Sequence, residues 1–179
     1  MGDGQQSGET SIGVADAEYL QQVVGRSGVG ATVVIERGPV TAFADAVLDD
    51  SPVYREPSAA TAAGFTAIPA PPTFAVAMEA WGRFAERQPP EPVIDVPAWE
   101  IMAPFMARGG LILHGEQEFE YHRPVMVGDV LVSEWKVVKA YQRESGASTM
   151  TFVLIETNWF DEATGKPVVT ARANAIHRS

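Results

Sequence analysis

The sequence predicts an α+β fold in which one antiparallel sheet wraps around a long central helix. Two observations lead to this fold class. Apolar side chains recur with helical spacing from Thr73 to Arg87, the longest such run in the chain. Four later segments are rich in Val, Ile, Thr and aromatic residues, as strands are: 111–121, 130–140, 149–160 and 168–176. Because a helix with an apolar face needs a covering layer, we expect these strands to form the sheet around it.

Length and composition favour one domain. The chain has 179 residues, of which 46% are hydrophobic, enough for one sizeable core. Residues 1–13 are polar and rich in glycine, so we expect a mobile tail there and a single domain over residues 14–179. No apolar run approaches the roughly 20 residues that span a bilayer, and the N-terminus has no basic segment followed by an apolar one. We therefore expect a cytoplasmic protein that does not enter membranes.

Charge and missing residue types exclude several classes of function. The net charge is -10, from 13 Lys and Arg against 23 Asp and Glu. This balance argues against a nucleic-acid partner, because phosphate binding needs a basic surface. The chain has no cysteine and only three histidines, so we expect no metal site and no other cofactor.

The first half of the chain predicts short helices around one strand. Residues 15–24 have helical spacing, residues 31–36 alternate as a strand does, and a helix begins at Gly38-Pro39. A second short helix, from residue 57 to 63, ends at Gly64, the residue type favoured just past a helix C-terminus. The loop that begins at Asp49 is thus expected between two helices.

The second half predicts the rest of the sheet. Residues 88–97 hold four prolines and indicate an irregular connector, and residues 98–107 are too short and ambiguous to assign. Turn sequences such as Val127-Gly128-Asp129 separate the later strands, which we expect to form an antiparallel meander. One strand before a long apolar helix and three or four after it is the arrangement of a hot-dog fold. Within it, Trp81 has the spacing of a core residue, and His177 is expected at the surface.

Several stretches, in a fixed order along residues 31–177, resemble a known family. They are Asp49-Asp50-Ser51-Pro52-Val53-Tyr54, then 59–65, Ala70-Pro71-Pro72-Thr73-Phe74, 113–119, and His122-Arg123-Pro124. In this order they resemble MaoC-like (R)-specific enoyl-thioester hydratases and (3R)-hydroxyacyl dehydratases. The likeness is to the subgroup whose N-terminal half resembles a fungal fatty-acid-synthase dehydratase domain.

The resemblance implies addition of water to an enoyl thioester, or the reverse reaction. A carboxylate and an imidazole hold the water, and a backbone N–H stabilises the thioester oxygen as it gains charge. The resemblance places the carboxylate at Asp49. The family's histidine falls on Tyr54, whose ordinary pKa of about 10 makes it a poor general base. The catalytic pair is therefore half present.

A second departure lies at the start of the expected central helix. The resemblance implies substrate contacts by Pro71, Pro72, Thr73 and Phe74. Family members have a His-Gly pair where this chain has Pro71 and Pro72, and the glycine amide binds the oxyanion. Proline has no N–H. Unless the amide of Thr73 replaces it, this contact is missing.

Other candidate site residues have structural alternatives beside the functional ones. Asp49 is either the catalytic carboxylate or an acceptor that fixes a turn. His114 alternates along a strand and is either a polar neighbour or a substitute for the missing histidine. Arg123 is either a ligand for a phosphate or a partner carboxylate, or part of a strand ending.

Three functions remain open. The chain is either the substrate-holding subunit of a heterodimeric dehydratase, or a self-sufficient homodimer that pairs Asp49 with Tyr54 or His114. The third possibility is an acyl-thioester binding protein or a hot-dog thioesterase that uses Glu79. In each case we expect a hot-dog dimer and a thioester of CoA or acyl carrier protein, in fatty acid or lipid metabolism. The acyl chain and the identity of any partner do not follow from the sequence.

Overall fold

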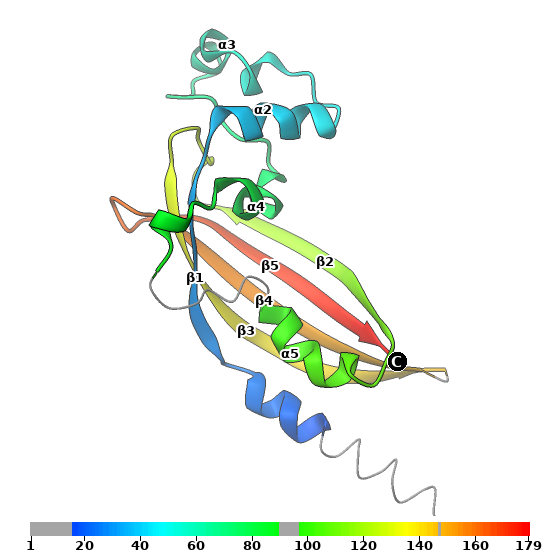
Figure 1. The fold of residues 1–179 in the computed structure, drawn as a ribbon. Coiled ribbons are helices and arrows are strands. Elements are labelled where there is room, and N and C mark those ends of the chain that lie inside the picture. The colour runs from blue at the N-terminus through cyan, green and yellow to red at the C-terminus, as the bar shows by residue number, and fades with distance from the viewer. Residues whose placement is uncertain (1–15, 90–96, 147) are drawn as a thin grey trace, which may run out of the picture.

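The computed structural model describes residues 16–89, 97–146 and 148–179. The expected tail, residues 1–13, and most of the proline-rich connector lie outside these residues. Five antiparallel strands form one sheet in the order β1-β3-β4-β5-β2, with helices along one face (Figure 1). The strands are β1 Ser27–Val34, β2 Leu111–Tyr121, β3 Val130–Ser145, β4 Ser148–Asp161 and β5 Pro167–Arg178. The predicted α+β hot-dog class is confirmed.

The predicted meander is wrong for one of its four strands. Strands β3, β4 and β5 follow one another in the sheet, but β2 pairs with β5, from Leu111 opposite Arg178 to Tyr121 opposite Val169. The free side of β3 is taken by β1, whose Val34 lies opposite Val130. Strand β2 therefore occupies the far edge of the sheet.

The predicted long central helix is also wrong. Residues 73–87 contain three short pieces: η2 Phe74–Val76, α4 Met78–Gly82 and η3 Ala85–Arg87. Gly82 packs so closely on β1 that a Cβ would lie 2.5 Å from the carbonyl oxygen of Val34, and Arg83 and Phe84 are extended. The spacing was informative about burial, because Phe74, Met78 and Gly82 are all buried.

The other helices follow the pattern in part. Helix α2 spans Arg37–Ala46 and α3 spans Pro57–Ala62, close to prediction, and Gly64 has a positive φ of 90°. The unassigned segment forms helix α5, Pro97–Met106, and residues 16–23 are helical. Strand β1 begins at Ser27, earlier than predicted, and Gly28 pairs there with Trp135, whose indole leaves no room for a side chain at Gly28.

Two hydrophobic clusters hold these helices on the sheet. One lies under α2, α3 and α4 and includes Phe74, Met78 and Trp159; the other lies under α5 and includes Phe105 and Trp135. Trp81 is 43% exposed and His177 only 3% exposed, so both burial predictions were wrong. The buried ring of His177 lies beside Phe105, and its Nε2 donates to the Gly109 carbonyl oxygen at 2.8 Å, which ties the segment after α5 to β5.

Candidate functional site

The Asp49 loop leaves the end of α2 through a left-handed residue, Leu48, with φ of 59°. The amide of Asp49 then donates to the carbonyl oxygen of Ala44, and its carboxylate accepts a hydrogen bond from the Ser51 amide at 3.1 Å. Arg55 donates to the carbonyl oxygens of Asp49 and Ser51 at 2.7 and 2.9 Å. The loop is thus held by its own polar groups, and Asp49 makes the turn contact that a structural role requires.

Tyr54 ends the 3₁₀ helix η1, Pro52–Tyr54, and is half-buried. Burial raises the pKa of its phenol, and the charge of Asp49 raises it further. The phenol makes no hydrogen bond within the described residues. Tyr54 is therefore a hydrogen-bond donor near neutral pH and not a base.

A pocket of about 410 Å³ lies beside this loop, and we call it the loop pocket. It brings together Tyr54, Pro72 and Arg123, three of the residues singled out in the sequence, together with Tyr121 and His122. Asp49 is not among the residues that line it. Burial raises the pKa of Tyr121 to about 12, and its hydroxyl donates to the carbonyl oxygen of Pro72.

Arg123 is engaged within the protein. Its guanidinium donates to Asp129 at 2.6 Å and to Asp161 at 2.9 Å. Asp129 also accepts from the amide of Met126 at 2.8 Å. Arg123 thereby joins the turn before β3 to the end of β4, and the binding role expected for it stays a prediction.

The residues at the start of the broken helix have different surroundings. Phe74 is buried against Phe43, with ring centroids 5.5 Å apart, and Pro71 is also buried. Thr73 is exposed, and its amide donates no hydrogen bond within the described part of the chain. Of this group, only Thr73 offers a free backbone donor near Pro72.

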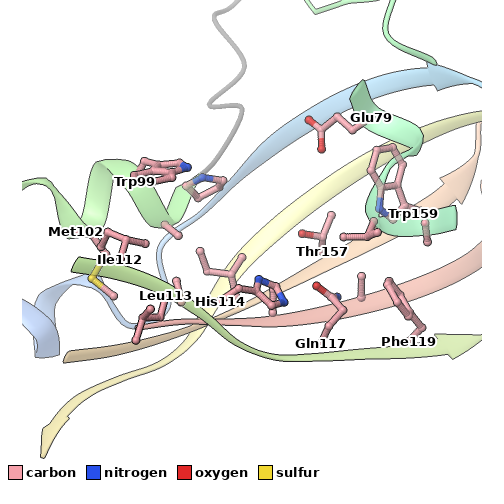
Figure 2. Close-up of a pocket in the computed structure, with 18 residues that line it drawn as sticks. Glu79, Trp99, Met102, Ile112, Leu113, His114, Gln117, Phe119, Thr157 and Trp159 are labelled. Atoms are coloured by element: carbon pink, nitrogen blue, oxygen red, sulfur yellow. The ribbon is translucent and has the colours of Figure 1, made fainter. Parts of the chain in front are cut away.

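A larger cavity of about 460 Å³ lies between the sheet and the helices α4 and α5, and we call it the sheet cavity (Figure 2). Its floor is a row of small side chains on β5: Ala171, Ala173 and Ala175. Apolar groups such as Trp159 and Met102 form much of the wall. This row of alanines leaves open space where larger residues would fill the core.

Four polar side chains also line the sheet cavity. His114 and Gln117 come from β2, Thr157 from β4 and Glu79 from α4. Figure 2 shows Glu79 reaching in from the helical side, while Thr157, His114 and Gln117 extend from the sheet. Burial raises the pKa of Glu79, and the charge of Arg83 partly opposes this shift. The structure thus places His114 in a different hollow from Tyr54.

Neither a metal site nor a membrane span is found in the part of the chain that the structure describes. There, no group of three or more His, Asp or Glu side chains is arranged to hold a metal ion. None of the helices described is both long and apolar enough to cross a bilayer.

Residues 22–171 match the family model of the FAS1-like dehydratase domain region. The chain belongs to this family. A UPF0336 protein of Saccharopolyspora erythraea is 31% identical over 144 residues, which cover 80% of this chain and 81% of that protein.

Solved structures share the fold of this FAS1-like dehydratase domain at low identity. One is a C-terminally truncated HadBC (3R)-hydroxyacyl-ACP dehydratase complex from Mycobacterium tuberculosis. It has a TM-score of 0.63 and 20% identity, and the match covers 86% of this chain and 96% of that chain. A MaoC-like dehydratase from Rhodospirillum rubrum has a TM-score of 0.58 and 18% identity, with coverage of 86% and 91%.

Gln117, Thr157 and Trp99 are among the residues lining the sheet cavity of this FAS1-like dehydratase domain that were missed in the sequence. The alternation of Ile155, Thr157 and Trp159 in β4 was a usable signal, since it puts all three on one face of the sheet. The alternating alanines of β5 were a second signal, because small residues on the helix-facing side leave space. Trp99 had no such signal, since α5 itself was not predicted.

Proposed function

We propose that this chain is the acyl-binding, catalytically reduced subunit of an (R)-specific enoyl-thioester hydratase or 3-hydroxyacyl-thioester dehydratase. One observation carries the proposal: the loop residues implied by the family and the sheet cavity lie apart. Tyr54 and Pro72 line the loop pocket, whereas His114 lines the sheet cavity. His114 therefore lies in a different hollow from Tyr54. His122, which does line the loop pocket, has its Nε2 hydrogen-bonded to the Thr170 hydroxyl at 3.2 Å.

The residues of the loop support a reduced catalytic role. Hydration needs a base to take a proton from water and a donor for the thioester oxygen. Asp49 already accepts the Ser51 amide, Tyr54 has a raised pKa, and Pro72 has no N–H to donate. We therefore assign the complete carboxylate and imidazole pair to a second hot-dog subunit. The HadBC dehydratase, which shares the fold, is itself a complex, and that likeness supports the assignment.

The sheet cavity supports the acyl-binding part of the proposal. Its volume of about 460 Å³ falls within the range of roughly 300–1,000 Å³ typical of small-molecule sites. The alanine floor and the apolar walls suit an acyl chain, whose transfer from water gains about 0.8 kcal/mol per methylene. The thioester carrier in this proposal is CoA or acyl carrier protein.

The test is the loss of enoyl-thioester absorbance when purified chain is added to a short and to a bulky enoyl-CoA. The chain alone should be inactive, and a hot-dog partner with an intact Asp and His should produce activity. Asp49→Asn in this chain should leave the activity of the complex unchanged. Activity of the chain alone that disappears in Asp49→Asn would instead assign the reaction to its own site.

A further inference from the structure

The polar groups of the sheet cavity are unusual for a site that holds only a hydrocarbon chain. Glu79, His114, Gln117 and Thr157 project among alanine and aromatic side chains (Figure 2). An apolar ligand would displace water from these groups and return no hydrogen bond, which is unfavourable.

Most of these groups have no hydrogen-bond partner among the residues that the structure describes. Gln117 Nε2 donates to the Arg172 carbonyl oxygen at 3.2 Å, which fixes the amide on the edge strand. The carboxyl of Glu79, the ring of His114 and the hydroxyl of Thr157 make no hydrogen bond within the described residues. The Glu79 carboxyl and the Thr157 hydroxyl, both on half-buried residues that line the cavity, are thus available to a ligand, whereas His114 is exposed.

The two walls offer complementary capacity. Thr157 has a hydroxyl that both donates and accepts, and it lies on the sheet side of the cavity. Glu79 lies on the α4 side, and because burial raises its pKa, its carboxyl holds a proton more readily than an exposed one and is then also a donor. A ligand hydroxyl between the walls can donate to one group and accept from the other.

We infer that the sheet cavity selects acyl chains with a hydroxyl part-way along the chain, in addition to the oxygen that the reaction adds or removes. The inference rests on the proposed function, because it takes the cavity as the acyl site. Glu79 and Thr157 are the residues that determine this specificity, and the alanine floor gives the chain its path between them.

Calorimetric titration tests the preference with matched ligands. The probes are dodecanoyl-CoA and a series of hydroxydodecanoyl-CoA esters whose hydroxyl moves along the chain beyond the third carbon. For at least one position, the wild type should bind the hydroxylated ester about 10-fold more tightly than dodecanoyl-CoA, as one well-placed hydrogen bond provides. Equal or weaker binding of every hydroxylated ester would overturn the inference.

Substitutions at Glu79 and Thr157 test whether these two residues cause the preference for a hydroxylated ester. Glu79→Leu and Thr157→Val should each remove it, so that the hydroxylated ester and dodecanoyl-CoA bind with the same Kd. Glu79→Gln keeps a donor and an acceptor and should retain it, as should the control Glu86→Leu, which changes an exposed residue outside the cavity. A preference that persists in both Glu79→Leu and Thr157→Val would refute the assignment.

The same titrations separate this inference from the proposed function. If dodecanoyl-CoA binds without any preference for a hydroxyl, only the inference fails. If no ester binds, either to the chain or to its complex with a catalytic partner, the acyl-binding function fails and the inference falls with it.

Discussion

The loop pocket and the sheet cavity differ less in size than in the state of their polar groups. In the loop pocket, the Arg123 guanidinium is paired with two carboxylates and the Tyr121 hydroxyl with a carbonyl oxygen. In the sheet cavity, Glu79 and Thr157 make no hydrogen bond within the described residues. The Arg123 and Tyr121 side chains of the loop pocket thus have partners within the protein. The sheet cavity, which His114 and Gln117 from the signature stretch 113–119 also line, holds polar groups that have none among the described residues.

Restoring the family residues in the loop pocket should have the largest effect. Tyr54→His returns an imidazole, and Pro72→Gly returns a backbone N–H near it. A positioned general base contributes roughly 100- to 10,000-fold, and an oxyanion donor roughly 100- to 1,000-fold. The double variant, tested without a partner, should therefore hydrate an enoyl-CoA at least about 100-fold faster than wild type.

Asp49→Asn added to the double variant is the control and should abolish the gained activity. If the folded double variant remains as inactive as wild type, Asp49 is not placed as the family resemblance implies. The loop pocket would then not be the remnant of a catalytic site.

The next largest effect should come from filling each hollow separately, which tests which of the two binds the acyl chain. Ala173→Phe places a ring on the floor of the sheet cavity, and Ala70→Phe places the same ring in the loop pocket. Excluding three methylenes from the cavity costs about 2.4 kcal/mol, or roughly 60-fold in Kd. Ala173→Phe should weaken dodecanoyl-CoA binding by about this factor in calorimetry, and Ala70→Phe should not. The reverse result would move the acyl site to the loop pocket.

A smaller effect tests whether Arg123 is structural. Arg123→Met leaves Asp129 and Asp161, whose side chains are 14% and 21% exposed, without their cation. We expect the free energy of unfolding to fall by about 2 kcal/mol in urea titrations, less than for a fully buried pair. The control is Arg87→Met, which removes an exposed pair with Glu162 and should change stability by less than about 1 kcal/mol. Weaker acyl-CoA binding at unchanged stability would instead support the predicted ligand role of Arg123.

The smallest expected effect is on the pH dependence of stability. Burial raises the pKa of Glu79 above its ordinary 4.5. Below pH 4.5 the group is protonated in both the folded and the unfolded chain. As pH rises further, the unfolded chain ionises first, so the free energy of unfolding falls until the folded carboxyl has also ionised.

Glu79→Gln removes this loss and should gain stability relative to wild type between acid and neutral pH. Urea titrations at several pH values measure the difference between Glu79→Gln and wild type. A constant difference between Glu79→Gln and wild type at every pH would show that Glu79 ionises alike in both states.

Local patterns predicted most of the sheet and little of the cavities. The limits of β2 were predicted residue for residue, because alternation and flanking turns are local properties. The break at Gly82 was not predictable, since it depends on contact with β1, which is distant in the chain. Helix α5 was not assigned because residues 98–107 are a short and ambiguous run, and the helix holds a proline, Pro104, in its interior. The position of His114 in the sheet cavity depends on the pairing of β2 with β5, and a meander would not have placed it there.

The broken central segment has a consequence for how a ligand enters. Helix α4 has only five residues, and isolated helices shorter than about 12–15 residues are barely stable. The helical wall over the sheet cavity therefore depends on its side-chain packing, whereas the floor belongs to long, fully paired strands. Such a wall opens at a lower free energy than the sheet does. In hydrogen exchange, the amide hydrogens of α4 should exchange well before those of β4. The same opening gives an acyl chain a route over the alanine floor without disturbing the strands.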